Sequence, residues 1–306
     1  MTEAEEAASH WDGTIVRLLG ARENEVFELS LGHTRAALRL HRTAYQTAAA
    51  IRAEIDWCAA LSAAGLPVPA PVATPEGERL VRLTTGRHAS VTSWIEGTPL
   101  GVMGEPLTQP VDVQIDLHHR LGRLMAEIHD CTDANPPARF PRPARDVDGL
   151  TGEAPVWGRF WEHPSANAED AATLRAARIF LRDRLLGGKD LNTGPIHADV
   201  LRENVLVHGR TVSLIDFDDC GTGFRLYDLG TAMLHNEYEP ARDDLRDALV
   251  AGYATLRRAD AGSVDLMTLA RGCASVGWTM PRLAPGDPVH ARHIARAVRM
   301  ARRIMG

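Results

Sequence analysis

The sequence predicts an α+β protein of two lobes, with a small β-rich N-terminal lobe and a larger, mainly helical C-terminal lobe. Short segments of strand character surround one helical stripe in the first third of the chain. Helical stripes dominate the remainder, in which one compact hairpin-like segment stands apart. A length of 306 residues suffices for two coupled lobes.

The N-terminal lobe begins with segments that predict strands. Residues 26–31 have strand character, and residues 36–41 alternate between apolar and polar side chains. Residues 32–34 contain a glycine and suit a hairpin turn between them. Residues 79–83 and 88–95 predict two further strands. The lobe should therefore be built on a small sheet.

One helix is predicted to pack against this sheet. Ile51, Ile55 and Cys58 lie at positions i, i+4 and i+7, which places them on one face of a helix. Residues 65–69 contain a glycine followed by prolines, which is typical of a helix end.

The lobe boundary is expected at the turn-rich residues 96–99, between an N-terminal lobe of residues 1–95 and a C-terminal lobe of residues 96–306. Residues 131–164 are rich in proline and charge and predict a long loop or insertion. Two apolar stripes at helical spacing predict helices in the larger lobe, namely Leu117, Leu121, Leu124 and Ile128, then Leu245, Leu249, Tyr253 and Leu256. Two apolar segments around a His-Gly-Arg turn predict a β-hairpin over residues 205–215.

Carboxylate and amide side chains flank this hairpin on both sides. Before it lies the pattern H-x-D-x-x-x-x-N, formed by His197, Asp199 and Asn204, and after it lies Asp216 in D-F-D. Because the two ends of a hairpin lie side by side, these loops should meet. Asn204 and Asp216 can then offer hard oxygen ligands to Mg²⁺, while Asp199 accepts a proton from an incoming hydroxyl. Phosphoryl transfer needs this combination of groups.

The pattern resembles that of the aminoglycoside phosphotransferase and choline kinase group, whose fold is similar to that of protein kinases. The specific part of the match runs from the H-x-D pattern to a Y-D-L motif that contains Asp228. The resemblance implies a protein-kinase-like two-lobed fold that uses ATP and Mg²⁺. It implies that Asp199 is the catalytic base and that Asn204 and Asp216 hold the metal. It also implies that His197 and Asp228 are structural supports.

The N-terminal lobe matches this family in layout and departs from it at one residue. In the family, a strand lysine binds the α- and β-phosphates of ATP and pairs with a helix glutamate. Arg39 and Glu54 occupy these positions here, which keeps the charge but changes the hydrogen-bonding geometry. The turn over residues 20–26 would cover the phosphates, with Asn24 and Val26 as nucleotide contacts.

The leading hypothesis is an O-phosphotransferase that moves the γ-phosphoryl group of ATP to a hydroxyl of a small molecule, such as an antibiotic, amino alcohol or sugar. A bacterial serine/threonine protein kinase of the stress-response type is the second, since residues 215–219 resemble that branch as well. A nucleotide-binding pseudokinase that acts as a partner is the third, suggested by Arg39. Asp218 is either a metal or substrate contact or part of a solvated acidic corner.

Other residues leave two interpretations open. Acidic residues after the metal motif, including Glu237 and Glu239, would suit an amine-bearing acceptor or serve as charges at a helix N-terminus. His129 is interpreted as a structural residue at a helix end, where its charge favours the dipole. Trp157 is interpreted as a packing residue, with the wall of a substrate pocket as the alternative.

Composition narrows the function classes. The formal net charge of -6 weighs against a nucleic-acid binder, which needs a basic surface. The four cysteines include no C-x-x-C pair, which favours a reducing compartment over a zinc or redox site. The acidic N-terminus is unlike a signal peptide, and no apolar run is long enough to span a bilayer. We therefore expect a cytoplasmic protein with no nucleic-acid or membrane partner.

Overall fold

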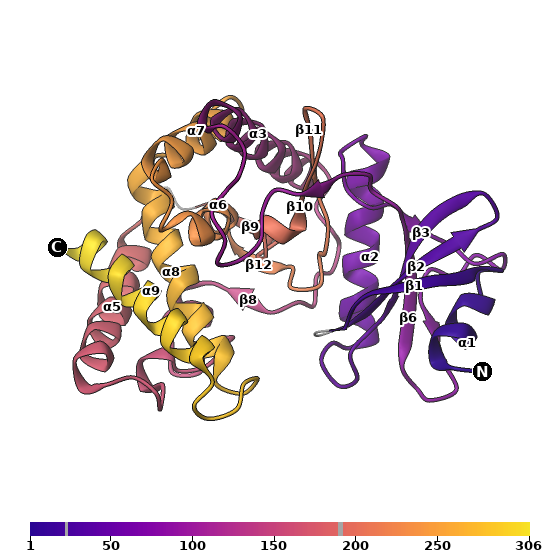
Figure 1. Cartoon of the computed structure of the whole chain (residues 1–306), viewed down its shortest axis with the longest axis horizontal. Helices are drawn as coiled ribbons and strands as arrows, with labels where there is room; N and C mark the ends of the chain where they lie inside the picture. Colours follow the sequence, from indigo (N-terminus) through magenta and orange to yellow (C-terminus); the bar gives the residue numbers. More distant parts are fainter. Residues whose placement is uncertain (22–23, 189–191) are drawn as a thin grey trace.

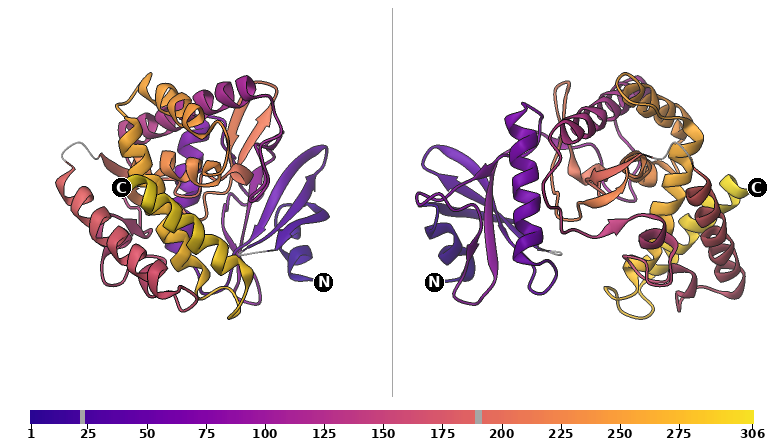
Figure 2. Two further views of the ribbon diagram at one scale, coloured as in Figure 1. Left: turned by 60° about the vertical axis from the view of Figure 1, so that its left-hand side comes forward. Right: turned by 180° about the vertical axis from the view of Figure 1, so that it is seen from behind.

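The structure, a computed structural model, describes residues 1–21, 24–188 and 192–306. Figure 1 shows a β-rich N-terminal part and a larger helical part, with the two chain ends at opposite extremes of the molecule. The predicted α+β class, with a small β-rich lobe and a larger helical lobe, is confirmed. In Figure 2, helix α2 (Ala48–Ala63) lies on the side of the sheet that faces the helical part.

The N-terminal sheet is antiparallel and has six strands within the described residues. Its order is β1-β2-β3-β6-β4, and β5 pairs with β6. Helix α1 (Glu3–Ser9) packs against β1 and β3. The strands are β1 (Thr14–Ala21), β2 (Glu25–Leu31), β3 (Thr34–Leu40), β4 (Pro71–Val72), β5 (Val81–Arg82) and β6 (His88–Ser93). The predicted strands are thus present, the one expected at residues 79–83 being shorter.

Helix α2 presents a glutamate, Glu54, to the sheet. The hydroxyl of Thr47 caps its first turn by accepting a hydrogen bond from the N–H of Ala50 at 3.1 Å. Gly65 follows the helix end with a φ of 81°, a conformation that glycine adopts without strain. The predicted apolar stripe is buried, so the helix has a fixed rotation and Glu54 points toward β3.

The helical part contains two close-packed helices, α3 (Val111–Ala134) and α7 (Arg242–Ala254). A side-chain carbon on Gly122 or Gly252 would collide with the backbone of the facing helix, so both positions require glycine. Helices α6 (Leu226–Met233) and α8 (Ala261–Thr279) contact α7. Helices α5 (Ala168–Gly187) and α9 (Pro288–Met305) pack on α8, and α4 (Val147–Thr151) packs on α5. Single turns of 3₁₀ helix occur at η1 (Phe160–Glu162), η2 (Arg202–Asn204) and η3 (Leu234–Asn236).

The predicted hairpin is confirmed and lies between the two parts. It consists of β10 (Val205–His208) and β11 (Thr211–Leu214), and β7 (Thr98–Pro99) pairs with β10. A second small sheet combines β8 (Ala144–Arg145), β9 (Thr193–Ile196) and β12 (Gly221–Phe224). The N–H of Ile215 bonds the carbonyl oxygen of Asn204 at 3.0 Å. The loops before and after the hairpin therefore start side by side.

Three expectations from the sequence are wrong. Residues 131–164 are not one long loop, because α3 continues to Ala134 and β8, α4 and η1 follow. These short elements depend on partners distant in sequence, which local patterning does not reveal. His129 consequently lies inside α3 rather than at a helix end. Leu256 lies beyond α7 and is 47% exposed, so the second apolar stripe ends one turn earlier.

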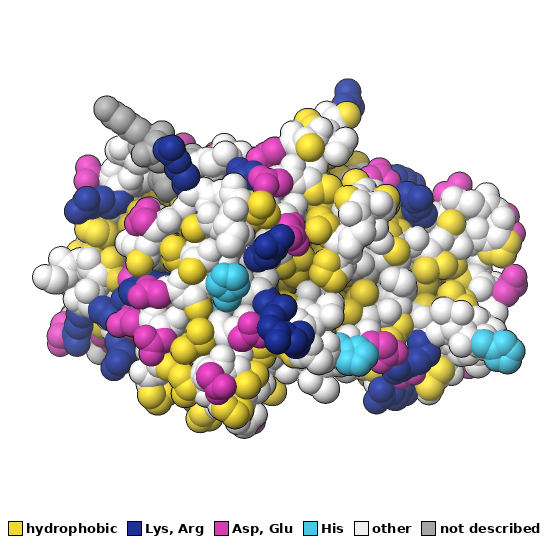
Figure 3. Space-filling model, turned by 90° about the horizontal axis from the view of Figure 1, so that it is seen from above, with side chains coloured by type: hydrophobic (Ala, Val, Ile, Leu, Met, Phe, Trp, Pro, Cys, Tyr) yellow, Lys and Arg dark blue, Asp and Glu magenta, His cyan; other side chains and the backbone are white. Residues whose placement is uncertain are grey.

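The surface carries both signs of charge. On the face seen in Figure 3, acidic and basic side chains are interspersed rather than gathered into one large patch. Among the described residues, no helix has the length and apolarity needed to cross a bilayer. The four cysteines are all free thiols.

Candidate active site

Asp199 lies in the loop between β9 and η2, where two side chains hold it. The Nδ2 amide of Asn204 donates to the Asp199 carboxylate and to its backbone carbonyl, each at 2.9 Å. The guanidinium of Arg271 donates to the other carboxylate oxygen at 3.0 Å. The structure thus brings the predicted base into contact with one of the predicted metal ligands.

The environment of Asp199 suits a proton acceptor. Burial raises its pKa to about 6, and the charge of Arg271 opposes part of this effect. A carboxyl group with a pKa near neutrality combines the ionised form with useful basicity. The preceding residue, Ala198, has a φ of 66°, in a region that side chains with a Cβ rarely occupy. Such strain persists only where neighbouring contacts enforce it.

Asp228 supplies those contacts from the start of α6. Its Oδ1 accepts from the N–H of Ala198 at 2.6 Å, and its Oδ2 accepts from the N–H of His197 at 2.9 Å. The Nε2 of His129 lies 3.2 Å from the same Oδ2. Burial raises the pKa of Asp228, but the hydrogen bond and charge of His129 outweigh burial and lower it overall. An ionised carboxylate with these donors around it is well placed to hold the Asp199 loop.

His197 joins the two loops that flank the hairpin. Its Nδ1 accepts from the N–H of Asp199 at 3.2 Å, and its Nε2 lies 3.0 Å from the carbonyl oxygen of Ile215. Because Nδ1 accepts, Nε2 carries the proton in the neutral ring and donates to Ile215. The ring also packs on Phe217, with 4.4 Å between ring centroids.

Arg39 reaches from β3 to two carboxylates. One guanidinium nitrogen lies 2.8 Å from Glu54, and another lies 2.8 Å from Asp216. Burial works against the charge, but the carboxylates of Asp216 and Glu54 raise the pKa of Arg39 above its ordinary value. The structure therefore brings the predicted phosphate-binding pair together and connects it to a predicted metal ligand. Asp216 itself has a φ of 63°, the second strained residue of the site.

Asp218 is buried rather than part of a solvated corner. Burial, followed by the charge of Glu54, raises its pKa to about 7. Its Oδ1 lies 3.9 Å from Arg39 and has no hydrogen-bond partner among the described residues. The neighbouring Asp219 accepts a hydrogen bond from the hydroxyl of Tyr45 at 2.8 Å, which brings the segment before α2 against the metal loop.

Asn204 and Asp216 present oxygens suited to Mg²⁺. Asn204 uses its Nδ2 for Asp199, so its Oδ1 is the atom left for a cation. Asp216 uses Oδ1 for Arg39, and no described donor bonds its Oδ2. The described residues contain no group of three or more His, Cys, Asp or Glu side chains arranged for a metal. Mg²⁺ commonly takes one or two protein ligands and completes its shell with phosphates and water, so this donor set fits it.

The turn expected to cover the phosphates is described only in part. Arg22 and Glu23 lie outside the described residues. Asn24 accepts a hydrogen bond from the N–H of Arg42 through its Oδ1 at 2.8 Å. Val26 stands opposite Arg39 in the register of β2 and β3, so it lies beside the predicted phosphate contact.

A cavity of about 590 Å³ adjoins the site through Tyr45, which bonds Asp219, and through Trp157, although Asp199, Asn204 and Asp216 do not line it. Tyr45 and Gln46 line it from the N-terminal part, and Trp157 and Met280 are among the residues that line it from the helical part. The guanidinium of Arg271 lies 4.5 Å from the centroid of the Trp157 ring. Trp157 is therefore both a packing residue and a wall of the cavity, on the side where Arg271 meets Asp199.

The model of the family described as "Phosphotransferase enzyme family" matches residues 14–262. The chain belongs to this family. The match includes every residue proposed for the site from sequence, and it ends before Arg271 and helix α9.

Curated relatives of this phosphotransferase-family chain include two homoserine kinases. That of Methylobacterium radiotolerans is 32% identical over 223 residues, which cover 70% of this chain and 63% of the relative. That of Neisseria meningitidis serogroup B is 28% identical over 235 residues, which cover 73% of this chain and 68% of the relative. The chain thus spans less than two thirds of the length of the first of these proteins.

Solved structures share the phosphotransferase fold. A microcompartment-associated aminopropanol kinase superposes with a TM-score of 0.85 and 28% identity, covering 99% of this chain and 96% of that one. An amicoumacin kinase in complex with AMP-PNP and Ca²⁺ superposes with a TM-score of 0.75 and 17% identity, covering 97% and 91% of the two chains. At 17% identity, the amicoumacin kinase supports the fold alone. Together the two structures confirm the expected protein-kinase-like architecture.

Two site residues of this family member escaped the sequence analysis. Arg271 contacts Asp199 from α8, and Tyr45 contacts Asp219 from the segment before α2. A signal for Arg271 does exist, because it is the one charged residue in the mostly apolar residues 266–276 of the sequence. Tyr45 has no such signal, since an isolated tyrosine before a helix is an ordinary feature.

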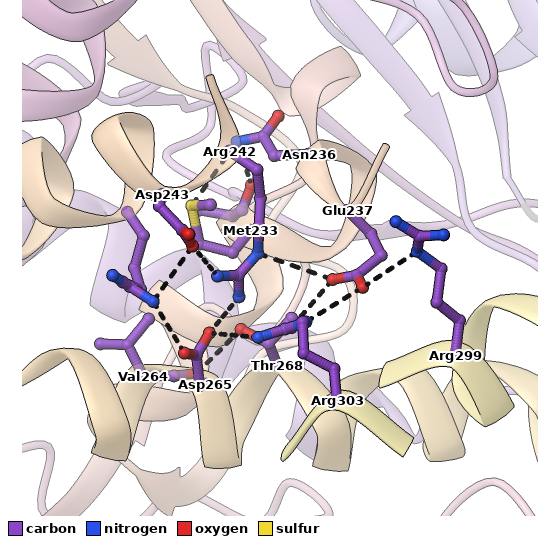
Figure 4. Close-up of polar contacts among 12 residues, drawn as sticks. Met233, Asn236, Glu237, Arg242, Asp243, Val264, Asp265, Thr268, Arg299 and Arg303 are labelled. Carbon is purple, nitrogen blue, oxygen red and sulfur yellow. Dashed lines mark hydrogen bonds and ion pairs between the residues drawn. The ribbon is translucent and has the colours of Figure 1, made fainter. Parts of the chain in front are cut away.

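Glu237 and Glu239 do not face the cavity as an amine-binding pair. Glu239 accepts from Arg202, and Glu237 lies 2.9 Å from Arg303. Figure 4 shows Glu237 within a network of arginines and acids that ties the segment after η3 to α7, α8 and α9. Both carboxylates are paired with arginines, so this acidic segment does not support an amine-bearing acceptor.

Proposed function

We propose that the protein is an ATP- and Mg²⁺-dependent kinase that phosphorylates a hydroxyl group of a small molecule. The observation that carries this proposal is the contact between Asp199 and Asn204, next to an Asp216 that Arg39 connects to Glu54. The proposed base, the proposed metal ligands and the proposed phosphate-binding arginine thus belong to one connected group of side chains. The use of ATP assigns the activity to the cytoplasm, which supplies that nucleotide.

Each residue has a defined part in this proposal. Asp199 takes the hydroxyl proton as the acceptor oxygen bonds the γ-phosphorus, while the bond to the β–γ bridging oxygen breaks and ADP leaves. Asn204 and Asp216 would hold Mg²⁺, which neutralises charge on the phosphates when bound. Arg39 binds phosphate oxygens, and Glu54 keeps its guanidinium in place.

The relatives support a small acceptor. Homoserine kinases and an aminopropanol kinase are named for acceptors that carry both a hydroxyl and an amino group. An acceptor of this size fits within the cavity of about 590 Å³ that Trp157 and Tyr45 line. We therefore propose a hydroxyl-bearing amino compound rather than a protein as the acceptor.

Two measurements test the proposal. Thermal unfolding is followed with and without ATP and Mg²⁺, because a ligand at about 100 times its dissociation constant stabilises the native state by about 2.7 kcal/mol. ADP release is then measured with a panel of small alcohols and with generic protein substrates. Stabilisation that needs Mg²⁺, with ADP release driven by a small alcohol, is expected. ADP release driven only by proteins would favour a protein kinase, and stabilisation without turnover would favour a pseudokinase.

A further inference from the structure

Two buried arginines belong to the wall that helices α8 and α9 form on one side of Asp199. Arg271 of α8 is 5% exposed and donates to the Asp199 carboxylate, and its Nε has no hydrogen-bond partner among the described residues. Arg296 of α9 is 8% exposed, and its contact with Ser275 places it one helical turn along α8 from Arg271. Arg145 of β8 adds a third buried guanidinium, 5.2 Å from the centroid of the Trp157 ring that Arg271 also covers. This wall of the site is cationic.

Arg296 has no carboxylate partner within the described residues. Its one hydrogen bond there is a long contact of 3.3 Å to the hydroxyl of Ser275, and its Nε has none. Burial, followed by the charge of Arg271, lowers the pKa of Arg296 to about 10, so the group stays cationic at neutral pH. A buried cation without a counter-charge is costly, and proteins normally pair it.

The carboxylates around Arg296 are already engaged. Glu237 lies 2.9 Å from Arg303 and 3.6 Å from both Arg242 and Arg299, as Figure 4 shows. Asp265 completes the network with further arginine contacts. These two acids are thus already shared among Arg242, Arg246, Arg299 and Arg303, which leaves neither of them for Arg296.

The histidines near Arg296 are uncharged and supply no counter-charge for it. Burial lowers the pKa of His293 to about 3 and lowers that of His235, so both rings are neutral at pH 7. Two other buried arginines show the contrast, since Arg202 pairs with Glu239 and Arg225 pairs with Asp133. Arg296 is thus set apart from these pairs by its lack of an acid.

We propose that the acceptor carries a carboxylate, which Arg296 and Arg271 bind while the acceptor hydroxyl faces Asp199. Arg271 would bridge the two, since one of its nitrogens bonds Asp199 and its Nε has no partner among the described residues. The planar fork of arginine matches a carboxylate in shape as well as charge. The inference rests on the proposed function and narrows its acceptor class to hydroxy amino acids.

Matched pairs of acceptors that differ only by the carboxylate test this proposal. Serine is compared with ethanolamine, threonine with 1-amino-2-propanol, and homoserine with 3-amino-1-propanol, in an ADP-release assay on the whole chain. We expect kcat/KM for the acid to exceed that for the amine by about 100-fold or more in at least one pair. An acceptor without the carboxylate would leave buried donors unpaired, which is a strong basis for rejection.

Substitutions assign the preference to Arg296. In Arg296→Gln the KM of the acid should rise by about 100-fold, whereas the rate with the matching amine should change little. In Arg296→Lys the KM of the acid should lie between those of the wild type and Arg296→Gln, because lysine keeps the charge and lacks the planar fork of the guanidinium. Arg292→Gln is the matched control, since Arg292 is exposed on the same helix, and it should retain the wild-type preference. Melting curves check that each variant is folded.

The outcomes separate this inference from the proposed function. Equal or better turnover of the amine in every pair would overturn the inference and leave the kinase assignment intact. Binding is measured independently as thermal stabilisation by each acid and amine without nucleotide. If no acid stabilises the protein more than its amine and none is turned over, the inference is overturned even when Mg²⁺ and ATP bind. Loss of the ATP response itself would instead overturn the proposed function.

Discussion

Arg39 and Asp216 lie 2.8 Å apart, although 177 residues separate them in the chain. The same guanidinium holds Glu54 at 2.8 Å. One side chain therefore couples the N-terminal sheet, helix α2 and the loop after β11. Because these contacts hold Arg39 in place before nucleotide binds, its charge would be preorganised for the phosphates that we propose it binds.

Replacement of Arg39 should weaken nucleotide binding. Arg39→Ala removes a charge-assisted contact worth about 1.5–3 kcal/mol, so the Kd for ATP with Mg²⁺ should rise by about 10- to 100-fold in calorimetry. Arg39→Lys should raise the Kd for ATP by a smaller factor, because lysine keeps the charge. Arg35→Ala on the same strand should bind ATP normally, since Arg35 pairs with Glu28 and Glu96 instead. An unchanged Kd for Arg39→Ala would remove this residue from the phosphate site.

Asp199→Asn should abolish most turnover and spare nucleotide binding. The amide has the shape of the carboxylate but cannot take the hydroxyl proton, and loss of a general base lowers kcat by about 10²–10⁴-fold. Burial raises the pKa of Asp199 to about 6, so a neutral side chain is tolerated there and folding should persist. Stabilisation by ATP and Mg²⁺ is the internal control. A variant that keeps more than about a tenth of the rate would show that another group accepts the proton.

Asp228→Asn should destabilise the fold. The backbone N–H groups of His197 and Ala198 and the ring of His129 all donate to this carboxylate. An asparagine would turn its own NH₂ toward at least one donor and leave buried groups unpaired, at about 1–3 kcal/mol. Urea unfolding measures the loss.

Asp183→Asn is the control for that experiment. Asp183 is exposed on α5, and surface changes of this kind stay within about 0.5 kcal/mol. Equal stability of Asp228→Asn and the control would mean that Asp228 does not support the Asp199 loop energetically.

His118 should make stability depend on pH. Burial lowers its pKa to about 4, although the hydrogen bond from Nδ1 to the carbonyl oxygen of Gln114 opposes part of this effect. Nε2 faces the amide of Asn236. The unfolded chain binds the proton from about pH 6.5 downward and the folded chain only near pH 4. Stability is therefore complete above pH 6.5 and falls as the pH drops toward 4, by up to about 1.4 kcal/mol per pH unit.

Urea unfolding at several pH values measures this dependence. His118→Gln keeps one donor and one acceptor but does not titrate, so its unfolding free energy should fall less steeply between pH 6.5 and 4. Parallel curves for the variant and the wild type would show that His118 binds its proton equally in both states. Other buried histidines, such as His293, contribute to the remaining slope.

Local sequence accounts for the half of the site that surrounds the hairpin. His197, Asp199 and Asn204 precede β10, and Asp216 follows β11 directly. A hairpin brings its own ends together, so the order of residues implies that these side chains meet. The helix of Glu54 was predictable for a similar reason, because its apolar stripe and its glycine stop are both short-range signals.

The acceptor side of the site depends on contacts that no local pattern contains. Arg271 and Arg296 come from different helices and lie on the same wall because α8 and α9 pack together, and of the two Arg271 contacts Asp199. Whether the nitrogens of an arginine are paired depends on which acids the fold brings near it. Here Glu237 is paired with Arg242, Arg299 and Arg303 rather than with Arg296. The chain order thus predicts the chemistry of phosphoryl transfer, whereas the burial and charge pairing from which we infer the acceptor arise only when distant helices pack together in three dimensions.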